Sequence, residues 1–345
     1  MHGREGHQQA AVGIVGAGLA GLSAARALAA AGVRVEAFDK GRGPGGRAST
    51  RRVELGDAVL RFDHGAQYFT VRDDRFARIV EHWSAQGACA PWIGQVAAVD
   101  SPGCIVPKAE SPWRYVGTPG MNAIVSALLT DLPDDARVRF STTVRSLEHA
   151  EAGWAIHADD GELGRFDALL VATPAPQAAG LLKPLPKLAE HAGTALMQPC
   201  WAVMAAFEEP LPIEADGLFL NQENQPLSWI ARDSSKPERS AGERWVLHAG
   251  PKWSQAHIED DREAVAEALL AAMAQATGAA IPRPIHAAAH RWRYALTTSR
   301  AEGGFLLDAR SRVAVAGDWC HGGRVEGAVL SGLRAADALL TLLHV

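Results

Sequence analysis

Three glycines near the N-terminus have the spacing that a nucleotide-binding turn requires. Gly16, Gly18 and Gly21 form GxGxxG between an apolar run, Ala11–Val15, and an alanine-rich stretch, Leu19–Ala31. Glycines there allow a tight turn, close approach of a pyrophosphate and packing of helix on strand. The start of the helix offers free N–H groups and a positive dipole end to phosphate. The alternative is a glycine turn that binds nothing.

An acidic residue follows at the distance expected for a ribose contact. A second predicted strand, Val33–Phe38, is followed by Asp39, 23 residues after Gly16. A carboxylate at that place can accept hydrogen bonds from ribose hydroxyls. Strand, helix and strand in about thirty residues also predict a βαβ unit of a parallel sheet. The pattern predicts a dinucleotide site without separating NAD from FAD.

Two further segments favour FAD. The stretch KGRGPGGRAST, Lys40–Thr50, is too rich in glycine and proline to continue a helix or strand, and it contains Gly45–Arg47. Near the other end, Gly317–Asp318 follows an apolar strand and Glu326–Ala328 opens the last helix. Together these segments resemble the GGR-type flavoproteins, the superfamily of amine oxidases and phytoene desaturases.

The resemblance implies how these residues bind the cofactor. In that superfamily the GGR loop lies along the pyrophosphate and ribityl chain, and its arginine reaches phosphate. The C-terminal acid meets the ribityl or phosphate groups, and the helix opening directs N–H groups at the flavin edge that gains charge on reduction. No cysteine occurs in 286–308, where covalent monoamine oxidases carry theirs, so we expect noncovalent FAD. The residues expected to contact it are Gly16, Gly18, Leu19, Ala20, Gly21, Asp39, Lys40, Gly46, Arg47, Val144, Gly317, Asp318, Glu326, Gly327 and Ala328.

Three internal stretches and the chain's ending resemble the renalase-like members, particularly the bacterial ones. They are DHGAQYFT (Asp63–Thr70), VLHAGPKWS (Val246–Ser254), HRWRYA (His290–Ala295) and the GD…EGA ending. Renalase-like enzymes take a hydride from 2- and 6-dihydro isomers of NAD(P)H, return NAD(P)+ and pass electrons to O2, giving H2O2. The resemblance implies that reaction, with a small dinucleotide-like substrate and O2 as partners. A dihydropyridine is already a strong hydride donor, so positioning matters more than a tuned acid or base.

By the same resemblance, Tyr68, His248 and Trp292 line the substrate side of the flavin. Tyr68 is expected to stack on or hydrogen-bond the nicotinamide, and His248 to hold the carboxamide or a ribose hydroxyl. Trp292 is expected to wall the pocket. The plain alternatives are a packed tyrosine, a satisfied core histidine and a core tryptophan. A pyrophosphate calls for nearby cations, and the candidates, each otherwise a surface charge, are Arg72, Arg232, Lys236, Arg291 and Arg293.

Two other functions are compatible with the same FAD-binding motifs. An amine oxidase or desaturase acting on a small or apolar substrate is one, although no lysine stands out as the flavin-N5 partner of many amine oxidases. A flavin-binding protein without turnover is the other. The middle of the chain has no second GxGxxG, and the sequence has no CxxxxC pair, which argues against the built-in NAD domain and redox disulfide of the disulfide reductases.

The composition narrows the class of protein. The 345 residues, 48% hydrophobic and 21% charged, are typical of a globular protein with a large core. A net charge of −5 argues against general nucleic-acid binding. Four scattered cysteines fit a reducing compartment, and no apolar run approaches the ~20 residues of a spanning helix. With no signal-like run at the N-terminus, we expect a cytoplasmic protein without nucleic-acid or membrane partners.

The order of elements predicts an α/β fold with two domains. Helices are expected at Asp73–Gln86 and Asp260–Ala276, and an irregular region at 87–112. We expect a Rossmann-like FAD-binding domain with a parallel sheet, and an inserted α+β substrate domain with a mostly antiparallel sheet. The first comprises 11–72, 113–180 and 301–345, and the second comprises 73–112 and 181–300.

Overall fold

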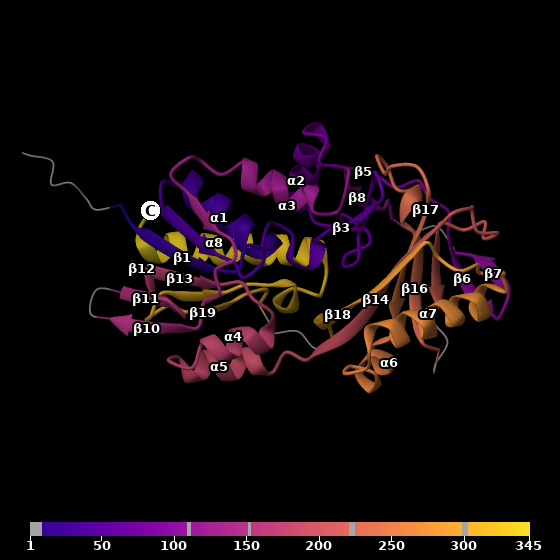
Figure 1. The fold of residues 1–345 in the computed structure, drawn as a ribbon. Coiled ribbons are helices and arrows are strands. Elements are labelled where there is room, and N and C mark those ends of the chain that lie inside the picture. Colours follow the sequence, from indigo (N-terminus) through magenta and orange to yellow (C-terminus); the bar gives the residue numbers. More distant parts are fainter. Residues whose placement is uncertain (1–8, 109–111, 151–152, 221–224, 299–302) are drawn as a thin grey trace, which may run out of the picture. The chain divides into compact units, whose positions relative to one another are not determined.

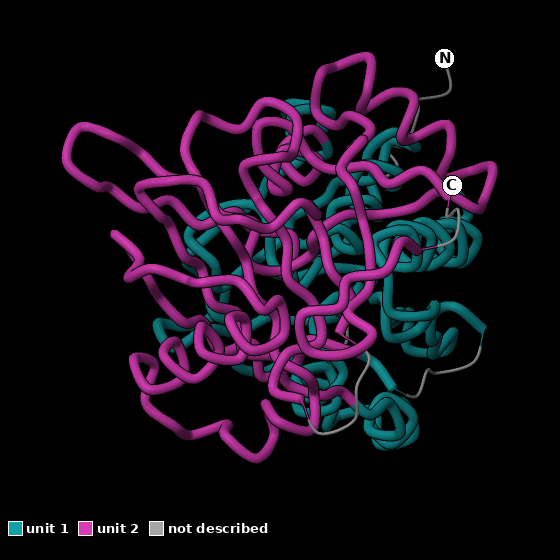
Figure 2. Tube along the Cα trace, turned by 90° about the vertical axis from the view of Figure 1, so that its right-hand side faces the viewer, with its two compact units in different colours: residues 1–46, 128–196, 297–345 teal, residues 47–127, 197–296 magenta. Residues whose placement is uncertain are grey.

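Two compact units make up the protein in the computed structural model (Figure 2). It describes residues 9–108, 112–150, 153–220, 225–298 and 303–345. Most of the polar N-terminal stretch, residues 1–10, therefore lies outside the described residues. Unit 1 comprises 1–46, 128–196 and 297–345, and unit 2 comprises 47–127 and 197–296. The assignment of FAD to one predicted domain and of the substrate to the other stays a prediction.

A six-stranded sheet forms the centre of unit 1. Its order is β19 (Leu306–Asp308), β20 (Val313–Val315), β13 (Ala168–Val171), β1 (Ala11–Val15), β2 (Arg34–Phe38) and β9 (Arg137–Arg139). All neighbours are parallel except β19 with β20. Both β1 and β13 are buried along their whole length, which explains their continuous apolar sequences. The predicted Rossmann-like parallel sheet is confirmed.

Different layers cover the two faces of this sheet. Helices α1 (Leu19–Ala30) and α8 (Val325–Leu343) lie side by side on one face (Figure 1). A second, antiparallel sheet contacts the other face, where Gly13 leaves room for side chains of its strands. Its strands are β10 (Ser146–Ala150), β11 (Gly153–Ala158) and β12 (Gly161–Phe166). Two short helices, α4 (Ala175–Leu181) and α5 (Pro186–Gly193), follow β13.

A seven-stranded sheet forms unit 2. Its order is β18 (His286–Thr297), β14 (Met197–Phe207), β17 (Glu243–Ala249), β16 (Leu227–Arg232), β15 (Gly217–Leu220), β6 (Val96–Ser101) and β7 (Cys104–Pro107). The pairs from β14 to β15 and the pair β6–β7 are antiparallel, whereas β15 and β6 are parallel. One face buries a large apolar core against α7 (Arg262–Thr277), and α6 (Pro251–Ala256) packs on β14. The predicted mostly antiparallel sheet is confirmed.

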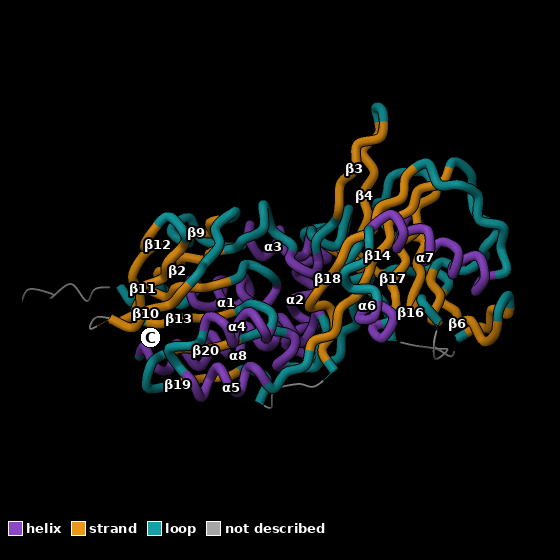
Figure 3. The backbone as a smooth tube through the Cα atoms, turned by 60° about the horizontal axis from the view of Figure 1, so that its bottom comes forward, coloured by secondary structure: helices purple, strands orange, loops and turns teal. Residues whose placement is uncertain are grey.

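Smaller elements complete unit 2. The hairpin of β3 (Arg51–Leu55) and β4 (Ala58–Phe62) can be followed in Figure 3. Phe62 packs on Val246 and Met204, on the face of the large sheet away from α7. Asp73 caps α2 (Asp74–Ala85) by accepting from Arg75 N at 2.8 Å. The remaining elements are β5 (Cys89–Pro91), β8 (Tyr115–Gly117), α3 (Ala123–Thr130), which crosses the unit boundary, and the short 3-10 helices Gly46–Ala48, Asp233–Ser235 and Asp318–Cys320.

The expectation of an irregular region at 87–112 is wrong. Its described part contains β5 and the hairpin of β6 and β7, whose turn uses Gly103 at φ +75°. Pro102 and Gly103 form this tight turn, while Pro91 and Pro107 lie at the ends of the short strands β5 and β7. Strand β18 was also not predicted, because HAAAHRWRYALT contains few β-branched residues.

The longest described helix, α8, has 19 residues, but Glu326, Arg334 and Asp337 interrupt its apolar sequence. Among the described residues, no helix is long and apolar enough to cross a bilayer.

Gly332 is expected to control the stability of unit 1. A Cβ added at Gly332 in α8 would overlap the carbonyl oxygen of Ala20 in α1. Gly332→Ala should therefore reduce the free energy of unfolding by about 1–3 kcal/mol through overpacking. The matched control is Gly180→Ala on exposed α4, where a Cβ meets nothing within 4 Å. Urea unfolding of both variants checks this, and an equally stable Gly332→Ala protein would contradict it.

Candidate active site

The parallel sheet of unit 1 gathers the predicted cofactor residues at one edge. Gly16 follows β1, Asp39 follows β2, and Gly317 and Asp318 follow β20. These strands run parallel through β13, so their carboxyl ends lie at the same edge. Open α/β sheets bind ligands outside this edge. Residues almost three hundred positions apart thus reach one candidate site.

The glycine turn combines close packing with open space. Gly16 has φ +105°, and a Cβ on it would lie 2.7 Å from the Ala172 carbonyl oxygen. A Cβ on Gly21 would overlap the Gly16 carbonyl oxygen, whereas one on Gly18 meets nothing within 4 Å. Gly18 caps α1 without a side-chain hydrogen bond, and no acid lies in the first turn. Leu19 and Ala20 are buried there, so the accessible groups are backbone N–H groups, which fit a pyrophosphate.

Asp39 joins the glycine turn to two neighbouring segments. Its Oδ2 accepts from Ala17 N at 2.7 Å and its Oδ1 from Gly41 N at 2.6 Å. Its carbonyl accepts from Thr142 N at 2.8 Å, which brings the segment that carries Val144 alongside. Because each carboxylate oxygen has two acceptor sites, capacity for a ribose hydroxyl remains.

The glycine-rich loop after Asp39 lies against the fingerprint turn. A Cβ on Gly46, which has φ +54°, would lie 3.7 Å from the Gly18 Cα. Lys40 is exposed. Past the unit boundary, the Arg47 guanidinium donates to the Ala295 carbonyl of β18 at 3.2 Å. The loop ends at Thr50, whose hydroxyl donates to Asp63 Oδ1 at 2.7 Å.

The C-terminal segment is tightly packed at the same edge of unit 1. Asp318 is 6% exposed and Glu326 is 8% exposed, so both acids are largely withdrawn from water. The Asp318 carbonyl accepts from His321 N and Gly323 N. A Cβ on Gly327 would overlap the His321 carbonyl oxygen, which explains a glycine in the first turn of α8, with partly buried Ala328 next to it. The Glu326 carboxylate suits the positive end of this helix dipole.

The large sheet of unit 2 has a core face and a candidate substrate face. Along β17, Trp245, Leu247 and Ala249 belong to the core against α7. Alternation along a strand therefore sends His248 to the opposite face. Trp229 of β16 pairs with His248 across a local irregularity of the two strands. The sequence WVLHA contains this alternation, although Trp229 was not predicted.

His248 and Trp292 meet at a single backbone carbonyl. Trp292 Nε1 donates to the His64 oxygen at 2.9 Å, and His248 Nε2 lies 3.2 Å from the same oxygen. The His64 ring stacks on Trp292 with centroids 5.0 Å apart, and His290 meets it edge-on at 4.8 Å. The structure thus brings two predicted substrate residues together, and His64 is the connecting residue that sequence analysis missed.

Tyr68 belongs to an aromatic cluster. Its ring centroid lies 5.6 Å from Trp229 and 6.4 Å from Trp92, and the Arg114 guanidinium stands 5.3 Å above it. The ring is partly exposed. The arrangement gives Tyr68 a fixed orientation together with an accessible surface, so its stacking role stays a prediction with structural support.

Three neighbouring histidines, His64, His248 and His290, are neutral at pH 7. Burial lowers the pKa of His64 to about 3, assisted by the positive potential of His290 and Arg51. Burial lowers the pKa of His248 to about 4 despite its contact with the His64 carbonyl. Burial also lowers the pKa of His290 to about 4. The ring nitrogens of this group therefore act as neutral donors and acceptors rather than as charges.

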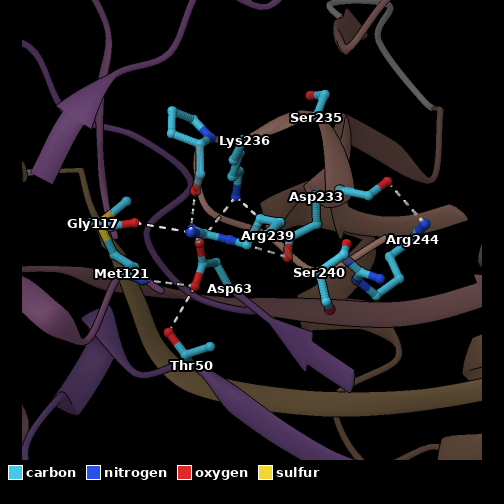
Figure 4. A network of polar contacts seen from close by, with 12 residues as sticks. Thr50, Asp63, Gly117, Met121, Asp233, Ser235, Lys236, Arg239, Ser240 and Arg244 are labelled. Carbon is cyan, nitrogen blue, oxygen red and sulfur yellow. Dashed lines mark hydrogen bonds and ion pairs between the residues drawn. The ribbon is translucent and has the colours of Figure 1, made fainter. Parts of the chain in front are cut away.

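A fully buried ion cluster lies at the start of the segment that carries His64 and Tyr68 (Figure 4). Asp63, Asp233 and Lys236 have no exposed side-chain surface, and the Arg239 side chain is 1% exposed. Lys236 Nζ lies 2.6 Å from Asp233 Oδ1 and 3.3 Å from Asp63 Oδ2. Arg239 also donates to Asp63 Oδ2, at 2.5 Å.

The two acids of this cluster differ in their titration. Burial opposes ionisation of Asp63, but Lys236 and Arg239 outweigh it and lower the pKa of Asp63. Burial raises the pKa of Asp233, and the negative charge of Asp63 adds to that effect. Asp63 is therefore the anion around which the donors gather.

The cations expected near the pocket have other partners. Arg232 pairs with Asp216 and Glu243 at 3.5 and 3.3 Å. Arg291 and Arg293 both pair with Glu259, while Lys236 belongs to the buried cluster. Arg72 is exposed. The alternative that Lys236 is a surface charge is wrong, and it is not available as a pocket cation, because its amine is enclosed by acidic and polar side chains.

Two family models match the chain. A model of flavin containing amine oxidoreductases matches residues 93–340, and one of NAD(P)-binding Rossmann-like domains matches residues 14–83. The first match covers well over half of the 345 residues. The chain belongs to the flavin-containing amine oxidoreductase family, and it is an FAD-dependent oxidoreductase.

Within this family the chain is similar to renalase along nearly its whole length. It is 22% identical to mouse renalase over 344 residues, which cover 94% of this chain and 97% of that protein. It is also 25% identical over 203 residues to the bifunctional protein MnmC of tRNA 5-methylaminomethyl-2-thiouridine biosynthesis from Magnetococcus marinus. That match spans 48% of this chain and only 29% of MnmC.

Solved structures of this fold agree with the architecture. A candidate protoporphyrinogen oxidase from Exiguobacterium sp. 255-15 aligns with a TM-score of 0.76 at 15% identity, covering 99% of this chain and 100% of its own. Cyclohexylamine oxidase from Brevibacterium oxydans aligns with a TM-score of 0.74 at 15% identity, covering 98% and 100%. At such identities these likenesses establish the fold alone.

Filling the open space at Gly18 should remove the cofactor without unfolding the protein. Gly18→Val places a branched side chain where a phosphate would approach the helix start, and no protein atom resists it within 4 Å. We expect at least a tenfold loss of bound FAD with little change in apoprotein unfolding. The absorbance ratio at 450 and 280 nm measures this, with Gly180→Val as control. Acid precipitation of the wild type should release all flavin.

The neutral histidines should make the fold sensitive to mild acid. Their pKa values of about 3 for His64 and about 4 for His248 lie below the usual 6.5. As pH falls below 6.5, the unfolded chain binds protons that the folded chain does not, so unfolding becomes easier. We expect a lower melting temperature at pH 5 than at pH 7.5. His248→Gln should reduce that difference, and an unchanged pH dependence in the variant would contradict the assignment.

Proposed function

We propose that the protein oxidises 2- and 6-dihydro isomers of NAD(P)H with bound FAD and O2. The substrate hydride, with its electron pair, leaves the dihydropyridine carbon and yields NAD(P)+. The two electrons and the hydrogen of this hydride, together with one proton, then reduce one O2 to H2O2. Similarity to renalase over nearly the full chain supports this proposal.

The observation that carries the proposal is the neutral histidine group of unit 2. His64, His248 and His290 have pKa values of about 4 or below, so these side chains are poorly suited to exchange protons near pH 7. Removal of a hydride from a dihydropyridine needs no base. An amine substrate must first lose a proton at neutral pH, and this group is poorly suited to accept it.

The side chains of unit 2 would bind and orient the nicotinamide. Tyr68 offers an aromatic surface, and Trp292 is fixed by its bond to the His64 carbonyl. His248 offers a ring nitrogen to the carboxamide. These residues lower the barrier by holding the donor ring in a reactive orientation and excluding water.

Residues of unit 1 would hold the cofactor. The start of α1 binds pyrophosphate, Asp39 binds ribose, and the opening of α8 provides N–H groups, as the superfamily resemblance implies. Bound FAD supplies the hydride acceptor. Noncovalent attachment is part of the proposal.

The second candidate is an amine oxidase, and the aromatic cluster favours it. Tyr68, Trp92 and Trp229 resemble the walls of a site for a small apolar amine. The pairing of Arg232, Arg291 and Arg293 with acids also leaves fewer cations for a pyrophosphate than the sequence suggested.

Anaerobic mixing of the holoprotein with reductants decides between these functions. The isomers 2- and 6-dihydro-NAD(P) should bleach the flavin at 450 nm at least tenfold faster than ordinary NADH, cyclohexylamine or putrescine. Readmission of O2 should give one H2O2 per NAD(P)+. Bleaching by an amine and not by the isomers would identify an amine oxidase, and no bleaching by any of them would identify a flavin-binding protein without turnover.

A further inference from the structure

The buried ion cluster of Asp63, Asp233, Lys236 and Arg239 is coupled to the segment 63–68. Asp63 Oδ1 accepts from Thr50 Oγ1 at 2.7 Å and from Met121 N at 2.8 Å. Its Oδ2 accepts from Lys236 and Arg239 (Figure 4). Both oxygens are therefore saturated by donors from three parts of unit 2, and the start of the segment is immobilised.

Lys236 also holds the far end of this segment. Its Nζ lies 3.4 Å from Gln67 Oε1, and the Gln67 amide nitrogen donates to the carbonyls of Asp63 and Gly65. The segment folds over the His64–Gly65 peptide as a closed loop. A Cβ on Gly65 would overlap the Arg47 carbonyl oxygen, so the loop has no room to shift on that side either.

Stability alone is a poor reason for such a cluster. Burial of charges costs solvation, and replacement of a buried ion pair by apolar groups of similar volume is often neutral or stabilising. What the cluster provides is a fixed position for the His64 carbonyl, on which Trp292 and His248 converge.

The His64 carbonyl determines the tautomer of His248. A carbonyl oxygen can only accept, so the 3.2 Å contact requires a hydrogen on His248 Nε2. In a neutral ring the other nitrogen, Nδ1, then carries a lone pair and no hydrogen. His248 can accept a hydrogen bond at Nδ1 and cannot donate one there.

We propose that Asp63 and Lys236 are positioning residues that act through the His64 carbonyl to hold His248 Nδ1 as an acceptor for an N–H group of the substrate. The proposal rests on the proposed function in placing substrate at His248. Primary carboxamides and amines have such N–H groups, whereas a hydrocarbon desaturase substrate has none. The substrate class is therefore one that carries an N–H donor.

The positioning role is tested by a variant that removes one buried ion pair without leaving an unpaired charge. Asp233→Leu/Lys236→Met keeps the neutral Asp63–Arg239 pair and replaces the other two groups by apolar side chains. The matched control, Arg145→Met/Asp159→Leu, removes an exposed ion pair with a 2.8 Å contact in unit 1. Gln67→Leu breaks the link from Lys236 to the segment and leaves all four charges in place.

The first readout is the His248 tautomer, measured at pH 7 by long-range ¹H–¹⁵N spectra of histidine-labelled holoprotein. Wild type and control should show a single Nε2–H tautomer. The double variant and Gln67→Leu should show tautomer mixing, together with at least tenfold slower flavin reduction at unchanged FAD content. A wild-type tautomer in a folded, flavin-loaded double variant or Gln67→Leu protein overturns the positioning role. This readout needs no substrate, so it stands even where the proposed oxidation fails.

The acceptor role is tested by titrating the wild-type holoprotein with NAD+ and with its 3-acetylpyridine analogue, which lacks the amide N–H group. We expect NAD+ to bind at least tenfold more tightly, and His248→Ala to abolish the difference. Equal affinities in the wild type, or binding of neither compound, overturn the acceptor role.

Discussion

Parallel strands that share one sheet must end at one edge, and unit 1 depends on this constraint. The chain reaches that edge after β1, β2, β13 and β20. The segment after each of these strands contributes a different group to the edge. These groups are a glycine turn, a carboxylate, a supporting carbonyl at Ala172, and the Gly317–Asp318 pair. Close packing of α1 on α8 through Gly332 then fixes the two helix starts relative to each other. Backbone hydrogen bonding in the sheet, together with this helix packing, thus gathers most of the candidate cofactor residues at one edge.

In unit 2, two features fix the candidate substrate residues: the alternation of side chains along the strands, and the buried ion cluster of Asp63, Asp233, Lys236 and Arg239. Alternation along β17 separates a core face from a face that carries His248. Nothing in a flat sheet fixes the rings on that second face. The segment 63–68 supplies the missing constraint, because one carbonyl accepts from two rings on different strands. The charges under this segment would be unfavourable in isolation, and they are tolerated because opposite charges and hydrogen-bond partners surround Asp63 and the Lys236 amine.

The sequence predicted the local features of the site and missed the long-range ones. Gly16, Gly18, Gly21 and Asp39 form a motif within one βαβ unit, so their spacing is visible without a structure. Lys236 was mistaken for a pocket cation because its burial depends on Asp63, 173 positions away, and its partner Asp233 three positions away does not by itself indicate a buried pair. His64 acts through its backbone oxygen, for which side-chain identity gives no signal. Alternation in WVLHA was the available clue to the His248 face, but pairing with Trp229 required the sheet register.

The division of unit 1 into three chain segments has a consequence for synthesis on the ribosome. Its sheet cannot gain β20, nor its helix layer α8, until residues 297–345 have been translated. Domains tend to fold as units while the chain emerges, yet the flavin edge of this one is completed last. During most of translation, α1 therefore lacks its packing partner α8, and the sheet that contains β1 lacks β20. Loading of FAD is then a late event that can coincide with closure of the fold.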